Sequence, residues 1–169
     1  MIQLISLNIN RDTEYFELCK EYARYDGSKY AKIDTIEKAR TRIESDIKLA
    51  GSEIPKNKVR TLVRWVENNK HELVGTCRIR LELLGDFALT GGHIGYDVRP
   101  KNRKNGIGTE ILRLALIEIR NNGIQNILVT CNDDNIGSSK IIERNGGILE
   151  NKIWDKDEGK EVRRYWIYK

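Results

Sequence analysis

The strongest hydrophobic pattern in the chain lies between residues 107 and 121, where apolar side chains recur every three or four positions. This spacing places them on one face of a helix, with charged residues on the remaining surface. Gly123 follows, and glycine often ends a helix because it adopts left-handed backbone angles without a steric clash. The pattern therefore predicts an amphipathic helix with an apolar stripe of Ile107, Ile111, Leu114, Ala115 and Ile119.

Weaker patterns predict further helices and a set of strands. Helical spacing recurs over residues 13–25, 33–49 and 135–145, and Gly146 is a stop signal for the last of these segments. Strands are expected where short segments alternate between apolar and polar residues or are rich in Ile, Leu and Val. These segments are residues 2–9, 59–67, 72–84, 92–98, 124–131, 148–154 and 162–168.

The order of these elements predicts an α/β fold. A turn at residues 68–70 joins two strands in an antiparallel hairpin, and Leu73, Cys77 and Ile79 share one face of its second strand because side chains alternate along a strand. The unit of strand, helix and strand over residues 92–131 is expected to be right-handed and parallel. Residues 51–58 are expected to form a loop. No repeat or linker divides the chain, so we expect one domain over residues 1–169.

Composition narrows the class of protein. Hydrophobic residues make up 39% and charged residues 33% of the 169 positions, as in soluble globular domains. No apolar stretch approaches the roughly 20 residues that cross a bilayer, and the first residues alternate in polarity instead of forming a secretory signal. We therefore expect a cytoplasmic protein without membrane contact.

Cysteine and histidine usage argues against a metal site. Cys19, Cys77 and Cys131 lie far apart and form no CxxC pair, which predicts free thiols. The only histidines, His71 and His93, have no cysteine at ligand spacing, so no metal is expected. The net charge of +5 suits an anionic ligand, and it is too small to indicate nucleic-acid binding by itself.

The segment RPKNRKNGIGTE, residues 99–110, carries the candidate chemistry. Gly106 and Gly108 each cost about 1 kcal/mol relative to alanine within a helix, so another property must favour glycine there. The first N–H groups of a helix are unpaired and attract phosphate, provided that no side chain blocks the approach. Arg103 and Lys104, with Arg99 and Lys101 nearby, favour the same anion. The segment predicts a pyrophosphate site, although a plain turn with solvated cations would give the same spacing.

Two common nucleotide-binding motifs do not fit this segment. A dinucleotide fingerprint requires a third glycine where the chain has Ile111, and a P-loop requires GK followed by Ser or Thr. Residues 103–108, RKNGIG, instead match the R/Q-x-x-G-x-G/A motif throughout, and the chain resembles the GNAT N-acetyltransferases. Asn135, Ser138 and Gly146 fill the places of a second signature of that family.

The resemblance implies a fold and a cofactor. The fold is of the α+β type: a mixed, mostly antiparallel sheet of six to seven strands, with helices on both faces and a V-shaped splay between the fourth and fifth strands. The pantetheine arm of acetyl-CoA lies in that splay and bonds to backbone like an extra strand. The cofactor-binding residues that this implies are Tyr96, Asp97, Val98, Arg103, Lys104, Asn105, Gly106, Ile107, Gly108, Thr109, Asn135 and Ser138.

The resemblance is incomplete at the catalytic groups. Many GNAT enzymes have a tyrosine seven residues after the Asn as proton donor for the departing thiolate, but this chain has Ile142 there. Solvent or another tyrosine, such as Tyr165, is the alternative. His93 and Asp97 are the candidate bases on the strand before the motif, His93 because of its near-neutral pKa. A structurally hydrogen-bonded histidine is the competing interpretation of His93.

Other polar and aromatic residues have a structural and a functional interpretation. Cys131 fits an acyl-carrying nucleophile or a small buried hydrophobe. Arg78, Arg80 and Glu82 fit a face that binds a carboxylate-bearing acceptor, or a face that is solvated or paired across strands. The tyrosines near the first helices fit an acceptor wall or aromatic packing; they are Tyr22, Tyr25 and Tyr30.

The expected activity is transfer of an acetyl group from acetyl-CoA to a primary amine of a small molecule or protein, directly and within a ternary complex. A non-catalytic acyl-CoA sensor and a nucleic-acid-binding domain are the rival interpretations. The sequence does not identify the amine, and both a monomer and a homodimer are compatible with it.

Overall fold

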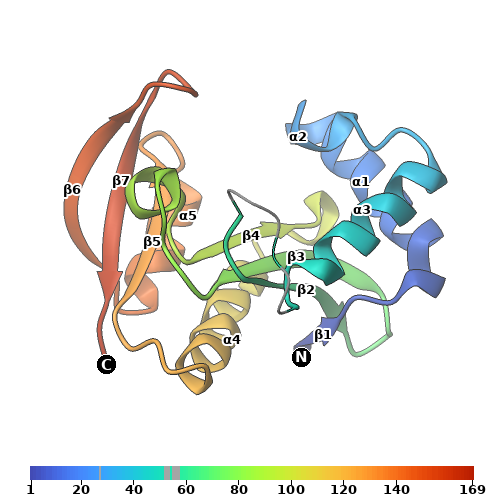
Figure 1. Ribbon diagram of the computed structural model, residues 1–169, viewed down its shortest axis with the longest axis horizontal. Coiled ribbons are helices and arrows are strands. Elements are labelled where there is room, and N and C mark those ends of the chain that lie inside the picture. The colour runs from blue at the N-terminus through green and yellow to red at the C-terminus, as the bar shows by residue number, and fades with distance from the viewer. Residues whose placement is uncertain (27, 52–53, 55–57) are drawn as a thin grey trace.

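The strands form two antiparallel sheets in this computed structural model, which describes residues 1–26, 28–51, 54 and 58–169 (Figure 1). The first sheet has the order β1-β2-β3-β4 and the second the order β5-β7-β6. The strands are β1 (Ile2–Ser6), β2 (Thr61–Asn68), β3 (Leu73–Arg80), β4 (Ile94–Val98), β5 (Ile127–Asn132), β6 (Ile148–Asp155) and β7 (Lys160–Ile167). The α+β class is confirmed, but the expected mixed sheet is two sheets whose described ladders are all antiparallel.

Helices cover both faces of the first sheet (Figure 1). On one face lie α1 (Asp12–Asp26), α2 (Ser28–Ala31) and α3 (Ile36–Lys48). The opposite face is covered by α4 (Ile107–Asn121), which connects β4 to β5. Helix α5 (Ile136–Arg144) follows β5 and packs beside α4. No helix among the described residues is long and apolar enough to cross a membrane.

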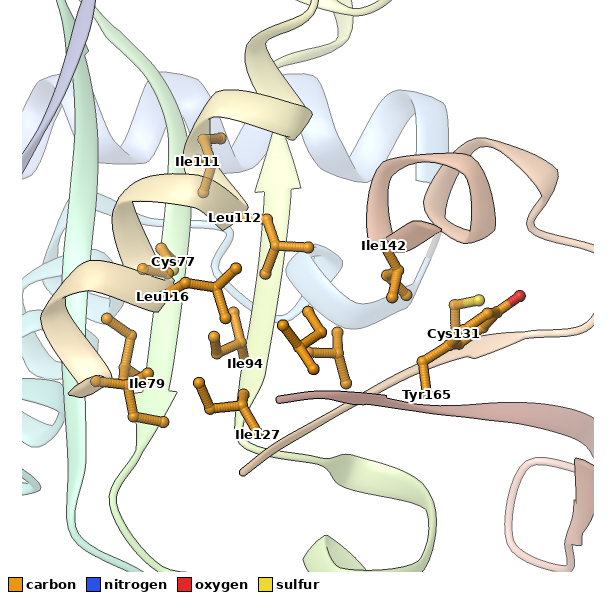
Figure 2. Packing of buried hydrophobic residues seen from close by; sticks show 14 of the residues in the cluster. Cys77, Ile79, Ile94, Ile111, Leu112, Leu116, Ile127, Cys131, Ile142 and Tyr165 are labelled. Atoms are coloured by element: carbon orange, nitrogen blue, oxygen red, sulfur yellow. The ribbon is translucent and has the colours of Figure 1, made fainter. Parts of the chain in front are cut away.

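The larger hydrophobic cluster lies beneath α4, as the periodicity of that helix predicts. Figure 2 shows Leu112 and Leu116 of α4 packed near Ile94 of β4 and Ile127 of β5. Leu112 and Leu116 are buried, whereas Leu114, which the sequence assigns to the stripe, is only half-buried. The apolar face of α4 is therefore wider than the predicted stripe, because α5 contacts it in addition to the strands β1, β3 and β4 of the first sheet.

The smaller cluster joins α1 and α3 to the other face of the first sheet. Leu18 of α1 and Ile43 of α3 pack with Trp65 of β2, and Tyr15 stacks on that indole at 5.4 Å. Leu73 also belongs to this cluster, so it does not share a face with Cys77 as the alternation predicts. The ladder between β2 and β3 shifts register at this point, and such a bulge reverses the face of the residues beyond it.

Some predicted boundaries are wrong for local reasons. The helix predicted over residues 33–49 begins only at Ile36, because the Thr35 hydroxyl accepts a hydrogen bond from the Lys38 amide at 3.1 Å and caps it. The strand predicted over residues 72–84 ends at Arg80, and a π-helical turn follows at Phe87–Gly91. Of the loop expected at 51–58, residues 52–53 and 55–57 lie outside the described residues.

Hydrogen bonds of His93, the residue directly before β4, link β4 to β5. The amide of His93 donates to the Leu128 carbonyl at 2.7 Å, and the Leu128 amide donates to His93 Nδ1 at 2.9 Å. Beyond this junction the two strands belong to different sheets, which leaves the expected V-shaped opening between them. Burial of His93, together with the charge of Arg80, lowers its pKa, so the imidazole stays neutral and Nδ1 stays an acceptor.

We predict that His93→Leu destabilises the protein, because it leaves the buried Leu128 amide unpaired. An unpaired buried donor costs about 1–3 kcal/mol, which urea unfolding at neutral pH would measure. His93→Asn should lose less, because Oδ1 can accept the same hydrogen bond. A His93→Leu protein as stable as the wild type would contradict the role given to this junction.

The lowered pKa of His93 also predicts a pH effect. Between the folded pKa and the ordinary value of 6.5, the unfolded chain binds more protons, so stability should fall as pH falls below about 6.5. His93→Asn should lack this part of the pH dependence. Equal slopes of unfolding free energy against pH in the two proteins would contradict it.

Candidate active site

A cleft of about 730 Å³ lies between the end of β4, the N-terminal end of α4 and the first turns of α5. The structure brings together at this cleft most of the residues expected to bind a cofactor, although they come from three elements. They are Tyr96, Asp97, Val98, Arg103, Lys104, Gly106, Ile107, Gly108, Thr109, Asn135 and Ser138. Asn105, which was expected among them, is exposed and is not part of the lining.

The backbone at Gly106 explains one of the two glycines. Gly106 caps α4 with a φ of 75°, a left-handed conformation that residues with a side chain rarely adopt. A Cβ atom there would meet nothing within 4 Å, so the backbone angle and not space is what requires glycine. The first amides of α4 follow at Ile107, Gly108 and Thr109, and a helix offers them no internal acceptor. They form an anion-binding end to the cleft.

Gly108 has a second role that the sequence did not indicate. A Cβ atom at this position would lie 2.7 Å from Cδ1 of Ile141 and 3.5 Å from Cγ2 of Val98. Glycine therefore leaves room for the end of the Ile141 side chain of α5 beside the first turn of α4, while Val98 of β4 lies at an ordinary contact distance. This contact brings the three walls of the cleft together.

The cations at the cleft differ in part from those expected. Arg103 and Lys104 line it, and Arg103 Nε donates to the Val98 carbonyl at 3.0 Å. Arg99, expected to join them, instead pairs with Glu21 through Nε at 2.8 Å and donates to the Leu73 carbonyl at 3.0 Å. This pairing lowers the pKa of Glu21.

Helix α5 supplies cations that the sequence analysis missed. Lys140 and Arg144 line the cleft together with Gly137 and Ile141. Their spacing of three and four residues places them on one helical face, and this was the signal available in the sequence. Asn102 and Asn132 are further lining residues that were not predicted.

The backbone of β4 is open toward the cleft at alternate residues. Arg80 donates its amide to the His93 carbonyl, and Arg99 donates to the Val74 carbonyl, both at 2.8 Å. In the antiparallel register of β3 and β4 these bonds belong to odd-numbered residues of β4. Alternation therefore directs the amide and carbonyl groups of Tyr96 and Val98 away from β3, toward the splay, where the Val98 carbonyl accepts the hydrogen bond from Arg103 Nε.

The backbone carbonyl of Asp97 points in a different direction from those of Tyr96 and Val98. Its carbonyl accepts a hydrogen bond from the Tyr22 hydroxyl at 2.9 Å, so this carbonyl does not face the splay as was expected. Its Oδ2 accepts from the Tyr30 hydroxyl at 2.6 Å. Tyr22 and Tyr30 stack at 4.5 Å and are both buried, whereas Tyr25 is 72% exposed. Two of the three tyrosines therefore hold Asp97 in place.

The other candidate base is not part of the cleft lining. His93 is 7% exposed and its Nδ1 is occupied at the junction with Leu128, which agrees with the structural interpretation. Cys131 is also buried, and burial raises the pKa of its thiol to about 11, so it is a poor nucleophile. Tyr165, considered as a replacement acid, donates its hydroxyl to Glu143 at 3.1 Å.

The polar residues of β3 are engaged within the protein. Arg78 Nη2 donates to Asp46 Oδ2 at 2.8 Å, and Arg80 donates to the Gly92 carbonyl at 3.0 Å. Burial lowers the pKa of Arg80 to about 10. Glu82 lies beyond the end of β3 and is exposed. Arg78 is therefore a paired charge, Arg80 is held by backbone carbonyls, and Glu82 is exposed to solvent, which agrees with the structural interpretation of these residues.

The start of α5 combines a structural and a binding position. Asn135 Oδ1 accepts a hydrogen bond from the Ser138 amide at 3.0 Å and caps the helix, while both residues line the cleft. Ile142, one turn later, is fully buried in the main cluster (Figure 2) and offers no proton. Among the described residues, no group of three or more His, Cys, Asp or Glu side chains is placed to hold a metal ion.

Comparison with solved structures identifies the fold. A microcin self-immunity acetyltransferase, MccE, with acetyl-CoA and AMP bound, matches 99% of this chain and 92% of its own at TM-score 0.81 and 17% identity. The ribosomal-protein alpha-N-acetyltransferase RimL, with coenzyme A bound, matches 99% and 93% at TM-score 0.78 and 15% identity. A chimera of the spermidine N-acetyltransferase SpeG from Vibrio cholerae with hSSAT matches 99% and 94% at TM-score 0.72 and 15% identity.

Comparison of sequences assigns the family. No curated protein sequence gives a significant match. The family model of the GNAT acetyltransferase domain matches residues 4–148, from β1 to the first residue of β6. The R-x-x-G-x-G motif at the start of α4 and the splay of β4 and β5 agree with this match. The chain is therefore a member of the GNAT acetyltransferase family.

Proposed function

We propose that the protein transfers the acetyl group of acetyl-CoA to a primary amine of a small molecule or protein, directly and within a ternary complex. One observation carries this proposal: the open backbone edge of β4 and the unpaired amides of α4 lie in one cleft with four cationic side chains. The cations are Arg103, Lys104, Lys140 and Arg144. MccE and RimL, with acetyl-CoA or coenzyme A bound, support it as structural neighbours.

The two ends of the cleft have different tasks in this proposal. The amides of α4 with Arg103 and Lys104 bind the diphosphate, and Lys140 and Arg144 favour the remaining phosphate. Charge-assisted hydrogen bonds contribute roughly 1.5–3 kcal/mol each, and neutral ones about 1 kcal/mol. The phosphates therefore supply most of the affinity, while the backbone of Tyr96 and Val98 aligns the arm.

The acceptor amine must lose a proton before it can attack. An alkyl ammonium with a pKa near 10.4 carries a handicap of roughly 4–5 kcal/mol at pH 7. Asp97 is the base candidate that we retain, because it lines the cleft and Tyr22 and Tyr30 fix its position. His93 is not retained, because its ring joins β4 to β5.

A non-catalytic acyl-CoA sensor is the second candidate function. The observation that favours it is Ile142, a buried apolar residue where many family members have the proton-donating tyrosine. Such a protein would bind coenzyme A in the same cleft without turnover.

A screen for thiol release from acetyl-CoA separates the two functions. The panel should contain simple amines, amino acids, polyamines, aminoglycosides and peptides. Stoichiometric thiol release and acetylated amine, identified by mass spectrometry, are the expected result. Binding without turnover across the panel would favour the sensor, and absence of coenzyme A binding would overturn both functions.

Charge reversal at the cleft tests the binding site. Lys104→Glu places a negative charge beside the diphosphate, and we predict that coenzyme A affinity falls by about tenfold or more in a calorimetric titration. Lys101→Glu is the matched control, since Lys101 is exposed on the preceding turn outside the cleft lining. Equal losses in the two variants would place the phosphates elsewhere.

A further inference from the structure

The hydroxyl of Tyr96 has no evident structural task. Its oxygen is shielded from solvent, and none of the described residues gives it a hydrogen-bond partner. An unpaired buried hydroxyl costs free energy, and native structures seldom retain one without a reason. Tyr96 also lines the cleft, so a ligand is the partner to consider.

The side chain of Tyr96 extends from β4 toward the two helices that form the rest of the cleft. Tyr96 and Val98 are on one face of β4, and both pack against the cluster that contains Ile142 of α5. Ser138, in the first turn of α5, influences the pKa of Tyr96 but lies outside hydrogen-bond geometry. The hydroxyl is therefore inside the splay, between the wall formed by β4 and the wall formed by α5.

The position of Tyr96 along β4 matches the reactive end of the ligand. Val98 lies against the first turn of α4, where the diphosphate is proposed to bind, because a Cβ atom at Gly108 would be 3.5 Å from its Cγ2. The splay closes at His93, three residues before Tyr96, or about 10 Å at 3.3 Å per residue. A pantetheine arm that enters the splay at Val98 and extends toward the junction at His93 therefore brings its reactive end close to Tyr96.

We propose, on the basis of the function proposed above, that the Tyr96 hydroxyl donates a hydrogen bond to the sulfur of the coenzyme and stabilises the departing thiolate. In that step the amine nitrogen forms a bond to the thioester carbonyl carbon. The carbon–sulfur bond breaks, and its electron pair moves to sulfur. The proton lost by nitrogen passes to solvent, and sulfur takes a proton from solvent, which leaves an amide and a thiol.

The environment of Tyr96 suits a hydrogen-bond donor that keeps its proton. Burial raises the pKa of its hydroxyl, and the Ser138 hydroxyl opposes this effect only in part. A donor of this kind stabilises charge on sulfur without ionising, as preorganised donors do for developing anions. The other positions considered for a donor are less suitable, because the Tyr165 hydroxyl already donates to Glu143 and Ile142 has no polar group.

The test measures the pKa of the coenzyme A thiol in the bound state and needs no acceptor. The thiolate is followed by its ultraviolet absorbance as pH rises, with desulfo-coenzyme A as the blank. A hydrogen bond to the thiolate favours the charged form, so the bound thiol should have a pKa lower by about one pH unit in wild type than in Tyr96→Phe. Tyr165→Phe is the matched control and should leave this value unchanged.

Two further measurements show whether the variant remains intact. Tyr96→Phe keeps the ring and removes only an unpaired hydroxyl, so its thermal midpoint should equal or exceed that of wild type. Its affinity for coenzyme A at neutral pH should stay close to the wild-type value. If wild type does not bind coenzyme A, the proposed function and the role of Tyr96 both fall. If it binds with the same thiol pKa in both proteins, only the role of Tyr96 falls.

Discussion

The candidate cofactor site depends on the two hydrogen bonds between His93 and Leu128. They hold β4 and β5 together at one point, while β4 belongs to one antiparallel sheet and β5 to another. A continuous ladder between these strands would use every outward amide and carbonyl of β4. Because pairing stops at the junction, no strand covers the edge formed by Tyr96 and Val98 at the side of the cleft, although Arg103 Nε donates to the Val98 carbonyl. A neutral imidazole is needed for this, and the burial of His93 provides it.

The second constraint is the close approach of three elements at the mouth of this opening. Gly108 leaves room for the Ile141 side chain against the first turn of α4, and α5 lies near the anion-binding amides. Lys140 and Arg144 thereby join Arg103 and Lys104 at one cleft. Positive charge is gathered at the mouth, whereas farther along β4 the lining holds the neutral side chain of Tyr96 and the carboxylate of Asp97. Such a gradient suits a ligand with a polyanionic head and a neutral tail.

Much of this arrangement could be predicted from local sequence. The periodicity of residues 107–121, the glycines at its start and the spacing of Asn135 and Ser138 identified α4, the cleft and the family. The failures involve contacts between distant residues. Arg99 was assigned to the anion site, but it pairs with Glu21 of α1. A register shift near Leu73 changes the face on which that residue of β3 lies, so simple alternation failed there. The position of the α5 cations at the cleft depends on the packing of α5 against α4, which local sequence does not indicate.

The central claim is that the open edge of β4 pairs with the arm of the coenzyme, and amide hydrogen exchange followed by NMR tests it directly. In the free protein the amides of Tyr96 and Val98 should exchange faster than that of Asp97, which faces β3. Addition of coenzyme A should slow exchange at Tyr96 and Val98 and leave Asp97 unchanged. Exchange at Tyr96 and Val98 that stays the same in the presence of saturating coenzyme A would contradict the account.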